Sequence, residues 1–270
     1  SPRYGEHWGR RWLDAAGYAD SEGIQHADTL RPWAYRYRDY VIRALNSDKP
    51  YDLFLLEQIA GDELANYEDA DAFTEEHLDR LVATGFLRMV EDGTNANITN
   101  FVPDRQDNID NEMRVLGSSV LGLTLHCAKC HSHKFDPVSQ ADYFRLRAIF
   151  KGAFDEHDWL SPSKRRLPFG HPEELKRWRE NKAAVDAEVA AIKANKELDE
   201  EAKKKALEAA EKKRIEQPMV RALWDRGQPS PTYLLNRGGY LEPRELIEPG
   251  LPRALVSPGE TFRAKPPWPG

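Results

Sequence analysis

Five consecutive residues, Cys127-Ala-Lys-Cys130-His131, hold the only two cysteines of the 270-residue chain. The C-x-x-C-H spacing is the attachment pattern of a c-type haem, in which each thiol forms a thioether with one vinyl group of the porphyrin. The histidine after the second cysteine then lies beneath the ring, where it can bind the iron. The spacing therefore predicts one covalent haem c per chain, with Cys127 and Cys130 as tethers and His131 as the proximal iron ligand.

The same spacing has other interpretations. A C-x-x-C pair is a redox dithiol in thioredoxin-like units, although that motif belongs in a strand–turn–helix context. His126 and His133 flank the motif and make zinc an alternative, but structural zinc usually draws on a second ligand pair farther along the chain. No further cysteine exists to supply one. A small disulfide is a third alternative, and two buried cysteines without chemistry are a fourth.

The surroundings of the motif resemble a known family. Residues 121–144, including His-Ser-His-Lys-Phe-Asp-Pro after the second cysteine, are similar to the cytochrome-like domain of large secreted planctomycete proteins. Four further blocks resemble the same family, namely residues 4–21, 31–42, 50–62 and 83–88. The resemblance covers residues 1–155 and resumes near 219–256. It implies a c-type cytochrome domain followed by a C-terminal partner domain, and it implies little about a substrate.

Further residues are candidates for the haem site. His133 and Lys134 belong to the family-like block and are predicted either to hold a haem propionate or to stabilise the local turn. Met89 is the candidate distal iron ligand, because it follows a predicted helix and precedes a polar loop. His26 and His157 are alternatives on loops. An iron with an open sixth position is a further alternative, and it would permit chemistry on small molecules.

Charge and hydropathy narrow the class of protein. The formal net charge is −6, which disfavours general nucleic-acid binding. No run of about 18 apolar residues exists, so no transmembrane segment is expected. No export signal is recognisable, yet covalent haem attachment requires export. We therefore expect a piece of a longer secreted or periplasmic protein, whose partner is a redox protein or the C-terminal domain of the same precursor.

The hydrophobic pattern predicts a mainly α fold with minor β structure. Apolar residues recur at helical spacing in six segments, residues 5–18, 31–46, 50–61, 73–88, 108–130 and 139–152. The aromatic stripe of the second segment is expected to pack in the core. Residues 91–107 are polar and turn-rich and are predicted to form a loop. The carboxylates of this loop are of the type that binds calcium. Their spacing does not match an EF-hand, so a solvated loop without calcium is favoured.

The amino-acid composition of the remaining chain changes at two points, near residue 172 and after residue 217. Residues 172–217 are rich in Ala, Glu and Lys, which predicts two helices in a charged hairpin. Beyond it, Pro and Gly punctuate short apolar runs, which is typical of short strands and extended segments. The predicted organisation has three parts, a helical c-type haem domain at 1–160, the charged hairpin at 161–217, and an extended/β segment at 218–270.

Three functions remain at this point. The first is electron transfer by a c-type cytochrome domain. The second is a haem-dependent oxidoreductase with an open iron site, acting for example on carbohydrate. The third is a non-redox interaction module stabilised by zinc or a disulfide.

Overall fold

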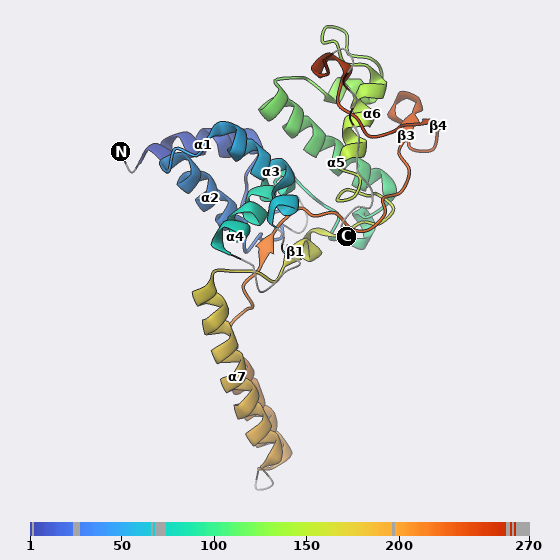
Figure 1. Cartoon of the computed structure of the whole chain (residues 1–270). Coiled ribbons are helices and arrows are strands. Elements are labelled where there is room, and N and C mark those ends of the chain that lie inside the picture. The colour runs from blue at the N-terminus through green and yellow to red at the C-terminus, as the bar shows by residue number, and fades with distance from the viewer. Residues whose placement is uncertain are drawn as a thin grey trace.

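The structure, a computed structural model, describes residues 1, 3–23, 28–65, 67, 74–195, 198–257, 260 and 262. Within these residues the fold is mainly α with two small antiparallel sheets (Figure 1), which confirms the predicted fold class. The α-helices in chain order are α1 (Tyr4–Ala16), α2 (Ala34–Asn46), α3 (Tyr51–Ala65), α4 (Glu75–Ala83), α5 (Val102–Leu116), α6 (Gln140–Ile149), α7 (Pro172–Ala194) and α8 (Glu200–Glu211). None of the described helices is both long enough and apolar enough to cross a membrane.

The aromatic stripe of α2 packs in the core, as predicted. Tyr37 and Tyr40 are almost completely buried. The indole nitrogen of Trp12 on α1 donates to the Tyr37 hydroxyl at 2.9 Å and to the Gln58 side-chain oxygen at 2.8 Å. Trp12 also meets the ring of Phe54 on α3 edge-on at 5.0 Å between centroids. Aromatic packing and satisfied polar groups thus join α1, α2 and α3.

Side-chain caps begin two helices close to the starts of the predicted segments 73–88 and 139–152. The Thr74 side chain accepts a hydrogen bond from the backbone nitrogen of His77 and begins α4. The Ser139 hydroxyl accepts from the backbone nitrogen of Asp142 at 3.1 Å and begins α6. Each cap satisfies a backbone N–H that has no partner inside the helix.

The helix predicted for residues 108–130 is wrong at both ends. It begins earlier, at Val102, because Asp104 accepts a hydrogen bond from the Phe101 backbone nitrogen at 3.0 Å and caps the first turn. It also ends earlier, at Leu116, and continues as one π-turn, η3 (Gly117–Leu121). Gly122 then adopts a φ of 63°, a left-handed conformation that stops a helix. The cysteine motif therefore lies on a separate short element, the 3₁₀-helix η4 (His126–Lys129).

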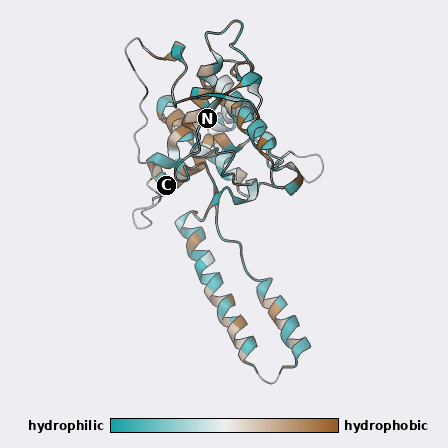
Figure 2. Cartoon of the chain, turned by 90° about the vertical axis from the view of Figure 1, so that its right-hand side faces the viewer, coloured by the Kyte–Doolittle hydropathy of each residue, from teal (hydrophilic) through white to brown (hydrophobic). Residues whose placement is uncertain are grey.

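The charged hairpin is confirmed as an arm that extends from the helical body (Figure 1). The helices α7 and α8 run side by side, and most of their ribbon is coloured hydrophilic in Figure 2. Only Val185 and Ala210 are fully buried among the described residues of these two helices. The arm has a thin apolar seam and is otherwise solvated.

The chain returns from the arm to the helical body. Strand β1 (Arg166–Leu167) pairs antiparallel with β2 (Val220–Arg221), one strand on each side of the arm. Strand β3 (Tyr233–Leu235) pairs with β4 (Pro243–Leu246) and packs against α6. Val220, Ala222 and Leu223 join the same buried cluster as the helices. The C-terminal segment is therefore part of the hydrophobic core of the body.

Charged side chains are buried where this segment meets the helices. We call them the buried arginine cluster: Glu22, Arg31, Arg88, Asp92, Glu112, Arg165 and Arg221. Glu22 accepts from Arg31 at 2.8 Å and from Arg221 at 2.6 Å. Asp92 accepts from Arg165 at 2.5 Å. These pairs join loops of the N-terminal half to the segments on either side of the arm.

Candidate functional site

Both cysteines lie on one exposed turn, residues 126–131, which we call the thiol turn. Cys127 lies within η4 and Cys130 follows it directly. Both thiols are free and exposed. In a 3₁₀-helix the side chains at positions i and i+3 lie above one another, so the two thiols project from the same side of the turn. Beneath them, Leu125 and Ala128 are fully buried and fix the turn to the core.

Polar contacts hold the thiol turn from below. The Gln140 side-chain nitrogen donates to the Lys129 carbonyl at 2.9 Å and to the Leu235 carbonyl at 2.8 Å, which ties the turn to α6 and β3. The Lys129 ammonium forms ion pairs with Asp110 and, at 3.3 Å, with Asp107 on α5. Burial would lower the pKa of Lys129, but Asp110 and Asp107 outweigh it, so this pKa lies above its ordinary value.

A glycine lets the chain approach the second thiol. Gly238 has a φ of 74°, and a Cβ atom placed there would lie 3.2 Å from the Cys130 sulfur and 3.1 Å from Cγ of Lys129. A larger residue would be strained by the backbone conformation and would crowd the thiol turn.

The histidines after the motif make local contacts. His131 is exposed, and its Nδ1 lies 2.8 Å from the carbonyl oxygen of Ser132. Nδ1 of His133 accepts from the Asp136 backbone nitrogen at 2.7 Å, which supports its predicted role in stabilising the turn. Lys134 is exposed, with its ammonium 5.2 Å from the centre of the Phe135 ring.

The candidate distal ligands are elsewhere. Met89 is 1% exposed, and its methyl group lies 3.4 Å from the position a Cβ of Gly85 would occupy, within the core of the N-terminal helices. His157 lies at a cavity described below. His26 lies outside the described residues.

The predicted covalent haem c is wrong. Among the described residues no group of three or more His, Cys, Asp or Glu side chains is arranged to hold a metal ion. The two thiols are exposed and free. This donor arrangement does not fit a haem tethered by Cys127 and Cys130 with His131 on its iron, because the ring must be enclosed and its iron ligated from side chains that converge. The propionate role of His133 and Lys134 and the distal-ligand role of Met89 depended on that haem. Zinc has no ligand set in the described part of the chain either.

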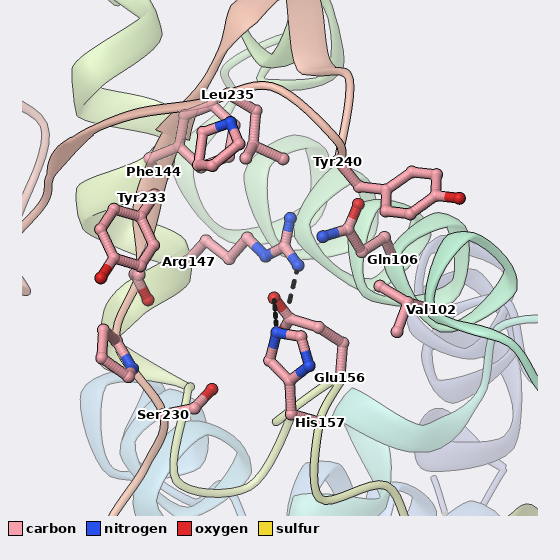
Figure 3. Close-up of a pocket in the computed structure, with 13 residues that line it drawn as sticks. Val102, Gln106, Phe144, Arg147, Glu156, His157, Ser230, Tyr233, Leu235 and Tyr240 are labelled. Carbon is pink, nitrogen blue, oxygen red and sulfur yellow. Dashed lines mark ion pairs between the residues drawn. The ribbon is translucent and has the colours of Figure 1, made fainter.

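A cavity of about 420 Å³ lies between α5, α6 and the C-terminal segment (Figure 3). It is lined by Val102, Gln106, Phe144, Arg147, Glu156, His157, Ser230, Pro231, Thr232, Tyr233, Leu235, Tyr240 and Pro243. In Figure 3 the Arg147 guanidinium lies at the centre and faces the amide of Gln106, with Glu156 and His157 on one side and the ring of Phe144 on the other. The lining combines aromatic walls with a few polar groups, which is typical of small-molecule sites.

Buried charges connect the cavity to the thiol turn. Asp110 pairs with Lys129, accepts from the Tyr143 hydroxyl, and lies 3.7 Å from Arg147. Arg147 lies 3.4 Å from Glu156. Burial first, and then the Asp110 carboxylate, raise the pKa of the Tyr143 hydroxyl well above its ordinary value. This hydroxyl therefore remains a hydrogen-bond donor to Asp110 at neutral pH.

Sequence reasoning missed this cavity. Its polar groups come from four separate segments, so no spacing brings them together. One local signal exists, since Arg147 lies four residues after Tyr143 and three after Phe144, on the apolar side of α6. An arginine on an apolar face indicates a buried partner or ligand.

The protein is thus a mainly helical domain with two features, an exposed C-x-x-C turn and a cavity with aromatic walls and polar groups at its centre. The chain belongs to the family described as PSCyt2, protein of unknown function (DUF1549), which matches residues 1–154. No curated protein matches the chain, and no solved structure does.

Proposed function

We propose that this chain is a redox domain that transfers electron pairs by thiol–disulfide exchange at Cys127 and Cys130. The observation that carries the proposal is the thiol turn, where two free and exposed thiols lie on one side of an anchored 3₁₀-helix. Side chains three residues apart on a helix have Cβ atoms roughly 5–6 Å apart. A disulfide needs about 3.5–4.5 Å, so a small adjustment of the turn closes the bond.

The exchange balances without a further cofactor. The thiolate of one cysteine attacks a disulfide of the partner and releases one partner thiol, leaving a mixed disulfide. The second cysteine then attacks the mixed disulfide and releases the other partner thiol. Cys127 and Cys130 lose two electrons and two protons and become a disulfide, while the partner disulfide becomes two thiols.

The resemblance of residues 121–144 to a domain of large secreted planctomycete proteins supports an exported location. A secreted or periplasmic location supplies disulfides as oxidants. The partner is then a redox protein or the C-terminal domain of the same precursor.

The test is equilibration of the chain in glutathione buffers of graded potential. Remaining thiols are alkylated at each potential and counted by mass spectrometry. We expect a single two-electron transition to an intramolecular disulfide. Cys127→Ser and Cys130→Ser should each give a mixed disulfide with glutathione, because the resolving thiol is missing. The double variant contains no cysteine and provides the baseline. Thiols that stay reduced throughout, or that form only bonds between chains, would rule the proposal out.

A further inference from the structure

The cavity at Arg147 has neither thiol in its lining, and we assign it a separate function. We infer that it binds an uncharged small molecule with several hydroxyl groups on a ring, a monosaccharide or cyclitol. A buried donor, the charges around it and the walls of the cavity all favour such a ligand.

The unpaired donor belongs to Arg147. This side chain is 3% exposed, and its Nη2 atom has no hydrogen-bond partner among the described residues. The Glu156 carboxylate lies 3.4 Å from Nη2 as an ion pair, and the Asp110 carboxylate lies 3.7 Å from the other terminal nitrogen, Nη1, so neither is at good hydrogen-bond distance. A buried donor without an acceptor is destabilising. An acceptor oxygen from a ligand in the cavity would remove that cost.

The charges exclude an anion as the best ligand. Burial would raise the pKa of Glu156, but Arg147 and Lys151 outweigh it, so this pKa lies below its ordinary value and the side chain is a carboxylate. The charges around the cavity are balanced: the cations Arg147, Lys129 and Lys151 pair with the carboxylates of Asp110, Asp155 and Glu156. No net positive charge is left for an anion, so a neutral ligand is favoured.

The polar groups at the centre favour hydroxyls. Arg147 only donates, Glu156 only accepts, and the Gln106 amide does both. A hydroxyl can accept from the guanidinium and donate to the carboxylate at once. Several hydroxyls on one ring match this alternation of donors and acceptors.

The walls fit the apolar faces of such a ring. Phe144, Tyr233 and Tyr240 present aromatic surface, and Leu235 adds an aliphatic side chain (Figure 3). Tyr233 and Tyr240 are each 41% exposed, so the entrance is aromatic. A volume of about 420 Å³ lies within the usual range of small-molecule pockets.

The test is calorimetric titration of the full chain with glucose and myo-inositol, and with benzoate as an anionic comparison. The chain should bind at least one of the two polyols more tightly than benzoate. Gln106→Leu keeps the size of the side chain and removes its amide, and Tyr240→Ala removes an aromatic wall. Each should weaken binding by about tenfold, the effect of one lost hydrogen bond or stacking contact.

Tyr51→Ala is the matched control, because Tyr51 is a 62% exposed tyrosine that does not line the cavity. It should bind as the unmodified chain does, and circular dichroism should show that all three variants are folded. Binding of neither polyol, tighter binding of benzoate, or equal weakening in Tyr51→Ala would each overturn the inference.

Discussion

The arm and the buried arginine cluster use the same charged residues in opposite surroundings. In the arm, Asp186 accepts hydrogen bonds from Lys182 and Arg214 at 2.8 Å each. These three side chains are between 32% and 52% exposed. In the cluster, the pair Asp92–Arg165 is no more than 2% exposed. The distances are similar, so geometry alone does not separate the two regions.

The difference lies in the solvent. In water the attraction of two charges is weak and competes with the entropy of ordering two long side chains. In the interior the attraction between the two charges is strong, but it has to offset the large cost of removing both from water. If one residue of the pair is replaced, the charge of the other stays buried without a partner. We therefore expect the cluster to control the stability of the body, and the arm pairs to contribute almost nothing.

Removing one partner of a buried pair should give the largest effect. Asp92→Ala leaves the Arg165 guanidinium buried without its carboxylate, so the free energy of unfolding should fall by about 3–5 kcal/mol. Urea denaturation followed by circular dichroism measures it. Asp158→Ala is the control, because that aspartate also pairs with an arginine, Arg226, but is 70% exposed. Equal losses in the two variants would contradict the comparison.

The second prediction concerns pH. Burial raises the pKa of Glu112 to about 7, although Arg88 and Arg165 oppose the shift. An unfolded glutamate has a pKa of about 4.3. Between these values the folded chain binds more protons at Glu112 than the unfolded chain does, so the group's contribution to stability falls as pH rises. It is complete below the lower value and lost above the upper one.

Glu112→Gln cannot ionise and should lack this component. Its stability relative to the unmodified chain should therefore rise between about pH 4.5 and about pH 8. Urea midpoints across this range give the two curves. Parallel curves would show that Glu112 is not a buried acid with a raised pKa.

The third prediction concerns an ion pair that is less buried than Asp92–Arg165 and less exposed than the pairs of the arm. The Lys129 side chain is 17% exposed and pairs with the buried Asp110, which keeps contacts with Tyr143 and Arg147 when the lysine is removed. Lys129→Met should lower the free energy of unfolding by about 1–3 kcal/mol, between the buried and exposed extremes. It should also speed alkylation of the cysteines, because the thiol turn loses an anchor.

Lys134→Met is the matched control for that change. Lys134 lies in the same segment, but it is exposed and its closest ring, Phe135, is exposed as well. It should leave both the urea midpoint and the alkylation rate unchanged. The same loss in both lysine variants would mean that burial of Asp110 does not matter.

Sequence predicted those parts of the molecule that local chemistry determines. Thr74 and Ser139 begin helices because their side chains accept from nearby backbone nitrogens. The Ala, Glu and Lys content of α7 and α8 predicts helices whatever surrounds them. The spacing of Cys127 and Cys130 puts both thiols in one short segment, but it does not specify the surroundings that a haem requires.

Sequence could not predict contacts between distant segments. Glu22 pairs with Arg221, almost two hundred residues later, and Arg147 lines a cavity together with residues from both sides of the arm. In a chain with this many charges, nothing in the spacing marks Asp92 as buried and Asp186 as exposed. That distinction arises only when the C-terminal segment packs on the helices.

The smallest effect should come from the arm itself. Asp186→Ala removes two ion pairs at once, yet the urea midpoint of the body should not change at moderate salt, since water and ions replace both partners.

Val185→Ala, one residue away, removes apolar surface from the thin seam between α7 and α8, where Val185 is 3% exposed. It should destabilise the hairpin by about 1–2 kcal/mol. Hydrogen exchange of α7 and α8 amides should detect opening in Val185→Ala only. Faster exchange in Asp186→Ala than in Val185→Ala would mean that surface charge, rather than the seam, holds the arm together, and the contrast with the buried arginine cluster would be lost.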